Sequence, residues 1–335
     1  MKIKNYFTPK SFVYTGEHHH IETKIVHYHF NDTTLKMSNN FKPLDFPKHY
    51  IQVIGLNDIE KIQALKEYYT IDSLILEDVF NVKQRNKIEV KPAYLFGVFH
   101  IEHLHEGEIL DDYMSLFMFK DTIISFHETE PVFLQPLHAL FETHKEIKEK
   151  PIDYLFYQIL DIITDQHIDV FDEIENYMSV FEEEILGSKN INQEDFYIVR
   201  KQLLRLKNSV TPTLEQLERA LERSELFTKE SEGYFEDLTD HLKRLDSQVN
   251  QARELMRNLL DLHINNQSNK MNRIMTTLTL FSAIFIPLSF LTGFFGMNFV
   301  HFDILEYEYS LGIFIAMCFI LAGLMFLLFK KMKWF

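Results

Sequence analysis

Polar and small side chains recur at a regular spacing where the sequence loses its charged residues. Residues 274–300 contain no Asp, Glu, Lys or Arg, yet hydroxyl side chains return there at steps of three and four residues. Such steps place residues on one face of a helix. We call this series the polar row; around the uncharged part it comprises Asn272, Met275, Thr279, Ser282, Ile286 and Ser289. Hydroxyl and amide groups on one helix face are better suited to lining a path for an ion than to catalysing a reaction that makes or breaks covalent bonds.

The polar row continues upstream, because the same rhythm leads back from Asn272 through Asp261 to Asp237. The element that carries it reads as one long helix over residues 234–300. An apolar series with heptad spacing lies about 200° away around that helix. It consists of Leu238, Leu242, Leu245, Val249, Ala252, Met256 and Leu259. We therefore expect the apolar series to pack on neighbouring helices and the polar row to face away from them.

Residues 274–300 and 309–329 are each long and apolar enough to cross a bilayer. A spanning helix has no water around it, so its polar row must face other protein or a water-filled path. Identical helices packed with this row inward would build a pore. The alternative, in which these small residues only pack helices together, stays open at this point.

The charges that flank the two apolar stretches predict their orientation. Lys270 and Arg273 precede the first stretch and lysines follow the second, whereas the connection between the stretches is acidic. Basic flanks stay on the cytoplasmic side. Residues 1–9 lack an apolar signal segment. We expect a multi-pass protein of the plasma (inner) membrane with both termini in the cytoplasm.

Composition excludes several classes of function. A net charge of −15 argues against nucleic acid as a partner. Cys318 is the only cysteine and lies in the second apolar stretch, so no disulfide can form within one chain. The sequence has no Gly-rich phosphate loop and no hydrolase or kinase signature. We expect neither enzymatic activity nor an organic cofactor.

The first 148 residues alternate between extended and helical patterns and predict an α+β domain, a sheet covered by helices. The extended segments are 11–14, 24–30, 50–55, 94–100, 113–119 and 122–127. Helices are expected at 59–69 after an Asn57 cap, at 72–81 and at 132–148. His27 and His29 share one strand face, and we interpret them as structural rather than metal-binding. The run His18, His19 and His20 is more typical of a solvated turn, and loose binding of a divalent metal there stays an open alternative.

The rest of the chain reads as helical. Helices are expected at 153–186 and after an Asn192 cap, and Pro212 should bend or break the second. The expected divisions are a cytoplasmic domain at 1–148, a helical hairpin at 149–232, a long helix at 233–298 whose span covers 274–295, an external loop at 299–308, a second span at 309–329 and a basic tail at 330–335.

The end of the first span resembles the signature of the CorA family of magnesium channels. The tripeptide Gly296, Met297 and Asn298 carries this resemblance, and residues 76–85, 285–299 and 330–335 are also similar to the family. The resemblance implies a funnel-shaped homopentamer in the bilayer whose long helices line a pore. It also implies inward conduction of Mg²⁺, and often of Co²⁺ or Ni²⁺, without ATP.

The resemblance implies a role for each residue of the pathway. A ring of Asn298 amides would accept hydrogen bonds from the water shell that Mg²⁺ sheds reluctantly. Met275 and Leu278 would form a hydrophobic constriction, and Asp261 an acidic ring at the inner end. The other pore-lining residues would be Asn272, Thr279, Ser282, Ile286 and Ser289. Cytoplasmic Mg²⁺ would be sensed between Asp78 of one subunit and Asp237 of its neighbour, with Glu77 nearby.

The external loop departs from the family pattern. Val300 stands where an acidic residue is usual, and the family's loop sequence is missing. Zinc-transporting relatives share the architecture, so a transporter of Zn²⁺ or another transition metal is the first alternative. A membrane-anchored coiled-coil scaffold that conducts nothing is the second.

Overall fold

The computed structural model describes residues 13–143, 145–187, 189–297 and 308–332. The chain divides into two compact units. The first comprises Met1–Glu184 and Asn190–Arg257, and the second comprises Ile185–Lys189 and Asn258–Phe335. The first holds a sheet with its helices, and the second holds two long apolar helical segments.

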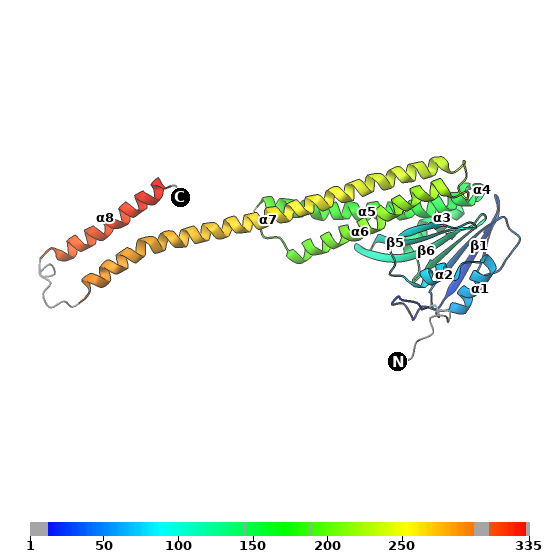
Figure 1. Cartoon of the computed structure of the whole chain (residues 1–335), viewed down its shortest axis with the longest axis horizontal. Coiled ribbons are helices and arrows are strands. Elements are labelled where there is room, and N and C mark those ends of the chain that lie inside the picture. The colour runs from blue at the N-terminus through cyan, green and yellow to red at the C-terminus, as the bar shows by residue number, and fades with distance from the viewer. Residues whose placement is uncertain (1–12, 144, 188, 298–307, 333–335) are drawn as a thin grey trace, which may run out of the picture. The chain divides into compact units, whose positions relative to one another are not determined.

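The sheet has seven strands in the order β2-β1-β3-β7-β6-β5-β4. Figure 1 shows this sheet, with β1, β5 and β6 labelled. Only β3 and β7 pair in parallel; the other pairs are antiparallel. The strands are β1 Lys24–Phe30, β2 Leu35–Ser38, β3 Lys48–Ile54, β4 Lys87–Val90, β5 Leu95–His105, β6 Glu108–Met118 and β7 Thr122–His127. The central strands are buried on both faces, which explains their nearly continuous apolar and aromatic sequence.

Two short helices, α1 Ile59–Tyr69 and α2 Ser73–Phe80, cover one face of the sheet. Each begins at an aspartate whose carboxylate accepts a backbone N–H: Asp58 from Lys61 and Asp72 from Leu74. Their apolar sides join Ile51, Val53 and other strand residues in one core. This packing holds α2, which carries Glu77 and Asp78, firmly on the sheet.

The remaining helices are η1 Val132–Leu134, α3 Gln135–Thr143, α4 Glu146–Glu149, α5 Ile152–Leu186, α6 Gln193–Arg223, α7 Glu232–Phe295 and α8 Ser310–Lys331. Asn192 caps α6 by accepting the Glu194 N–H at 3.0 Å. Every residue of the apolar heptad series on α7 is buried, as the spacing predicted.

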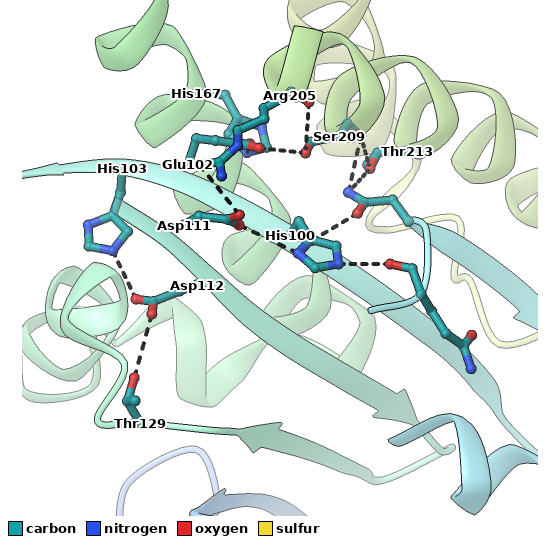
Figure 2. Close-up of polar contacts among 12 residues, drawn as sticks. His100, Glu102, His103, Asp111, Asp112, Thr129, His167, Arg205, Ser209 and Thr213 are labelled. Atoms are coloured by element: carbon teal, nitrogen blue, oxygen red, sulfur yellow. Dashed lines mark hydrogen bonds and ion pairs between the residues drawn. The ribbon is translucent and has the colours of Figure 1, made fainter. Parts of the chain in front are cut away.

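Figure 2 shows a layer of polar contacts between the sheet and helices α5 and α6. The buried carboxylate of Glu102 on β5 lies 3.2 Å from His167 Nε2 on α5, and Ser209 Oγ on α6 donates to it at 3.0 Å. Asn86 beside β4 donates to the Ser209 carbonyl at 3.1 Å and to Thr213 Oγ1 at 3.2 Å. These buried polar contacts fix the position of α5 and α6 on the sheet.

Several predicted elements match and several do not. The segments 24–30, 59–69 and 122–127 are confirmed. Within the predicted segment 11–14, the described Val13 and Tyr14 are not in a strand. The predicted helix 132–148 is divided into η1, α3 and α4. Asp58, not Asn57, caps α1, because the Asn57 amide instead donates to the carbonyls of His18 and Ile21.

Helix α6 continues through Pro212. A proline removes one backbone hydrogen bond from a helix. The side chains of Ser209, Val210 and Thr213 beside it are buried, and α6 packs on β4 and β5. Burial of this side of the helix offsets the lost hydrogen bond, so the predicted break does not occur.

Candidate ion pathway and cation-sensing residues

The polar row lies on the exposed side of α7. In the second unit Asn272, Thr279 and Ser289 are exposed and Ser282 is half-buried. Leu280, on the opposite side of the helix, is buried, and Phe295 contacts Phe314 of α8 with ring centroids 5.3 Å apart. Within the described residues, α8 therefore packs away from the centre of the polar row.

The apolar members of the row are also uncovered. Met275 and Ile286 are 59% and 67% exposed, and Leu278, which lies beside the row, is 65% exposed. Asp261, further upstream on α7, is exposed as well. The α7 and α8 helices are the two in the described part of the chain that are long and apolar enough to cross a membrane. An exposed row within such a helix requires lipid, another chain or water to cover it.

The row ends at a tight turn after α7. The Gly296 N–H donates to the Thr292 carbonyl at 3.0 Å, and the Met297 N–H donates to the Phe294 carbonyl at 3.3 Å. A Cβ atom at Gly296 would lie 2.9 Å from the Thr292 carbonyl oxygen, so a side chain there would force that carbonyl to move. Asn298, the predicted filter residue, lies outside the described residues.

Asp78 is neutralised within its own chain. Its carboxylate accepts from Lys87 Nζ at 2.6 Å and from the Gln84 side chain, and Lys87 also reaches Glu89 at 2.7 Å. Burial lowers the pKa of Lys87, but hydrogen bonds to Asp78 and Glu89 outweigh it and raise that pKa overall. Glu77 beside it is half-buried. A cation at Asp78 must therefore compete with the Lys87 ammonium.

Asp237 lies on α7, with its side chain 64% exposed and 3.8 Å from His241 Nε2. It belongs to an acidic group that also includes two aspartates of α5. Burial raises the pKa of Asp161, and the charges of Asp165 and Asp237 raise it further. Burial and the charge of Asp169 likewise raise the pKa of Asp165. Carboxylates that repel one another in this way are relieved by a bound cation.

Sequence reasoning missed Asp161 and Asp165. The signal was present, because Asp161, Asp165 and Asp169 recur at steps of four on one helix face. Only the packing of α5 against α7 places this face beside Asp237. In one chain, Asp78 and Asp237 stand on different elements with separate partners. Their pairing across a subunit boundary stays a prediction.

Comparisons with known proteins show what this chain is similar to. The family model described as "CorA-like Mg2+ transporter protein" matches residues 51–331. The "Cobalt/magnesium transport protein CorA" of Thermotoga maritima is 29% identical, and the alignment covers 100% of this chain and 98% of the relative. The "Zinc transport protein ZntB" of Photorhabdus laumondii is 26% identical over 58% of this chain and 60% of its own length.

The fold is also known from solved structures. The complete structure of the CorA magnesium transporter from Methanocaldococcus jannaschii superposes with a TM-score of 0.79 and 20% sequence identity. The match covers 94% of this chain and 100% of that chain. The sheet domain, the long helix and the two C-terminal apolar helical segments therefore form one known architecture.

Proposed function

The chain belongs to the family of CorA-like Mg²⁺ transporter proteins, and we propose that it carries Mg²⁺ into the cell through a homopentameric pore. At the level of the family it is a divalent-cation transporter of a membrane, and the members are transporters rather than enzymes. The ion, the pentamer and the orientation with both termini in the cytoplasm are parts of the proposal.

The exposed polar row of α7 carries the proposal. The centre of the row faces away from α8, and the row follows one line along the helix from Asp261 to Ser289, whereas Asn272 near its inner end lines a pocket together with Phe326 of α8. Copies of α7 around an axis would cover this row and leave a path lined by hydroxyls and amides. Met275 and Leu278 would narrow the path near its cytoplasmic end. In the scaffold alternative the same small residues would only pack helices together, which gives no reason for the row to continue through Asn272 to Asp261.

The membrane potential suffices to drive this transport. Each elementary charge gains about 2.3 kcal/mol per 100 mV, so a divalent cation gains about 4.6 kcal/mol on entering a negative interior. No nucleotide is needed. Asn298 would complete the pathway as a ring of neutral amides, which accept hydrogen bonds from the hydrated ion without binding it too tightly to release it.

Cytoplasmic Mg²⁺ would regulate the pore through Asp78, Asp237 and Glu77. The repulsion among Asp237, Asp161 and Asp165 favours a state in which a divalent ion holds these carboxylates together. Loss of the ion would release that state and open the pathway. Mg²⁺ would thus be both the transported ion and the regulatory ligand.

Zn²⁺ is the second candidate for the main transported ion. The family resemblance extends to ZntB zinc transporters, and Val300 replaces the acidic residue usual after the signature. This departure from the family pattern removes one argument for Mg²⁺ as the main ion and leaves Zn²⁺ as a candidate.

Ion uptake into liposomes tests the proposal. The purified protein is reconstituted, a K⁺ diffusion potential is imposed, and uptake of Mg²⁺, Co²⁺ and Zn²⁺ is compared between wild type and Asn298→Ala. We expect Mg²⁺ uptake that follows the potential and is lost in the variant. Asn269→Ala, an amide removed from exposed α7 outside the polar row, is the matched control and should conduct. Uptake of Zn²⁺ without Mg²⁺ would move the function to zinc. Failure of an intact oligomer to pass any ion would favour the scaffold.

A further inference from the structure

Three histidines converge on the face of the sheet that α1 and α2 cover. His27 and His29 alternate along β1, and His49 on β3 is the direct cross-strand partner of His29. The side chains of His27 and His29 are 1% and 0% exposed, and His49 is half-buried. One ring nitrogen from each residue lies within 4.8 Å of one from each of the others. This trio, which we call the histidine cluster, is remote in sequence from the polar row.

The distances between these nitrogens fit a metal ion. His27 Nε2 lies 3.2 Å from His49 Nδ1, and His29 Nδ1 lies 3.1 Å from the same atom. A tetrahedral Zn²⁺ with bonds of about 2.0–2.1 Å separates its ligand nitrogens by about 3.3 Å. These two separations are therefore close to the ligand–ligand distances of such a tetrahedral site.

Protons alone do not satisfy the histidine cluster. The Lys42 N–H donates to His27 Nδ1 at 3.4 Å, which leaves the His27 proton on Nε2, facing His49 Nδ1. Ser38 Oγ donates to the Asn40 carbonyl at 3.2 Å and so accepts from His29 Nε2 at 3.3 Å. The His29 Nδ1 lone pair then also faces His49 Nδ1. If His49 Nδ1 carries no proton, its lone pair faces the lone pair of His29 Nδ1. If it carries a proton, its N–H faces the N–H of His27 Nε2.

We propose that the histidine cluster binds a transition-metal dication of the Zn²⁺, Co²⁺ or Ni²⁺ class, with one position left for water. Three neutral imidazoles are a donor set for these ions. Mg²⁺ is excluded because it requires oxygen ligands. The His29 Nε2–H bond to Ser38 supplies the outer partner that orients a metal-binding ring. The site is separate from the transport pathway and does not depend on which ion is carried.

The electrostatics keep the rings in the form that binds metal. Burial lowers the pKa of His27 to about 3, and the charges of His29 and His49 contribute. Burial also lowers the pKa of His29 and of His49. Lys36 and Lys42 near His29 oppose a cation, whereas Asp121 near His49 favours one. The cluster is thus neutral at pH 7 and needs no proton release before an ion binds.

Metal binding has a structural consequence for the segment between β2 and β3. With His27 Nε2 on the ion, the proton of that ring must move to Nδ1, where it faces the Lys42 N–H. The bond from Lys42 is then lost. We therefore expect faster hydrogen exchange at the Lys42 amide in the loaded protein, although the protein as a whole becomes more resistant to heat.

Zinc titration of the full-length protein in detergent tests the proposal. Chelator-stripped protein is titrated with Zn²⁺ in excess Mg²⁺, and the bound zinc per chain is measured. We expect one Zn²⁺ per chain in wild type and none at equimolar zinc in His49→Gln. His105→Gln, which changes an exposed histidine at the end of β5, is the matched control and should keep the ion. A variant with His18, His19 and His20 all changed to Ala should also keep it.

Cobalt spectroscopy places the ion even if His49→Gln folds poorly. Co²⁺ bound to wild type should show the visible absorption of a tetrahedral site. His49→Cys supplies a sulfur in the same position and should add a near-ultraviolet sulfur-to-cobalt band. Zinc that survives His49→Gln, zinc lost with His18, His19 and His20, or Co²⁺ that never shows a sulfur band with His49→Cys would each overturn the assignment.

Discussion

Lys87 should set the concentration of internal Mg²⁺ at which transport is inhibited, provided that Asp78 belongs to the sensing site. Lys87 Nζ lies 2.6 Å from the Asp78 carboxylate, and both side chains are 25% exposed. A regulatory cation must displace this ammonium. The change Lys87→Met removes the charge and keeps an apolar stem near the Phe96 ring, which Lys87 Nζ approaches to 5.5 Å.

The size of the effect follows from the partial exposure of the pair. A charge-assisted hydrogen bond contributes about 1.5–3 kcal/mol when shielded, and a surface ion pair about 0–1 kcal/mol. With a quarter of each side chain exposed, we take about 1 kcal/mol, which corresponds to about a fivefold change in affinity. Lys87→Met should therefore lower the half-inhibiting internal Mg²⁺ concentration about fivefold.

The assay is the initial rate of uptake into proteoliposomes loaded with graded internal Mg²⁺. Lys91→Met is the matched control: Lys91 lies 3.1 Å from Glu89, so this variant makes the same change in net charge without touching the Asp78 ion pair. Lys87→Arg should keep the wild-type value. An equal shift in Lys91→Met would mean that net charge alone is responsible. An unchanged or higher inhibiting concentration in Lys87→Met would refute the competition between Lys87 and the cation.

Three further predictions concern stability and the pathway. Burial lowers the pKa of His127 to about 3, so as the pH falls below about 6.5 the unfolded chain takes up a proton at this residue before the folded chain does. This difference should remove about 2 kcal/mol from the free energy of unfolding at pH 5, and urea titration should find the total acid-induced loss smaller by about that amount in His127→Gln. Glu102→Ala removes the carboxylate that accepts from the buried Ser209 hydroxyl and lies beside His167, and should lower the free energy of unfolding by about 1–3 kcal/mol, whereas an unchanged free energy would mean that water replaces the carboxylate. In a background without the native cysteine, Ser282→Cys in the polar row should react with a water-soluble thiol reagent. Thr277→Cys, on the other side of α7, should not react. Equal reactivity of the two variants would contradict a pore along the polar row.

Local periodicity was sufficient for much of the fold. The apolar heptad series on α7 and the limits of β1, α1 and β7 follow from spacings and end signals carried by adjacent residues, so they could be predicted without the rest of the molecule. The short strands β2 and β4 were missed, because four residues at a sheet edge carry little periodic signal and are held by their pairing partners.

The chemistry of the cytoplasmic part was decided in three dimensions. The family resemblance implied Asp78 and Asp237 but not the Lys87 that neutralises one or the neighbouring Asp161 and Asp165 of the acidic group that includes the other. The same sequence showed His27 and His29 as neighbours on a strand, and only the register with β3 brings His49 onto them. Spacing along the chain determines which residues share a face. Strand order and helix packing determine which faces contact one another, and the ion pairs and the proposed metal ligands lie on different elements that only these contacts bring together.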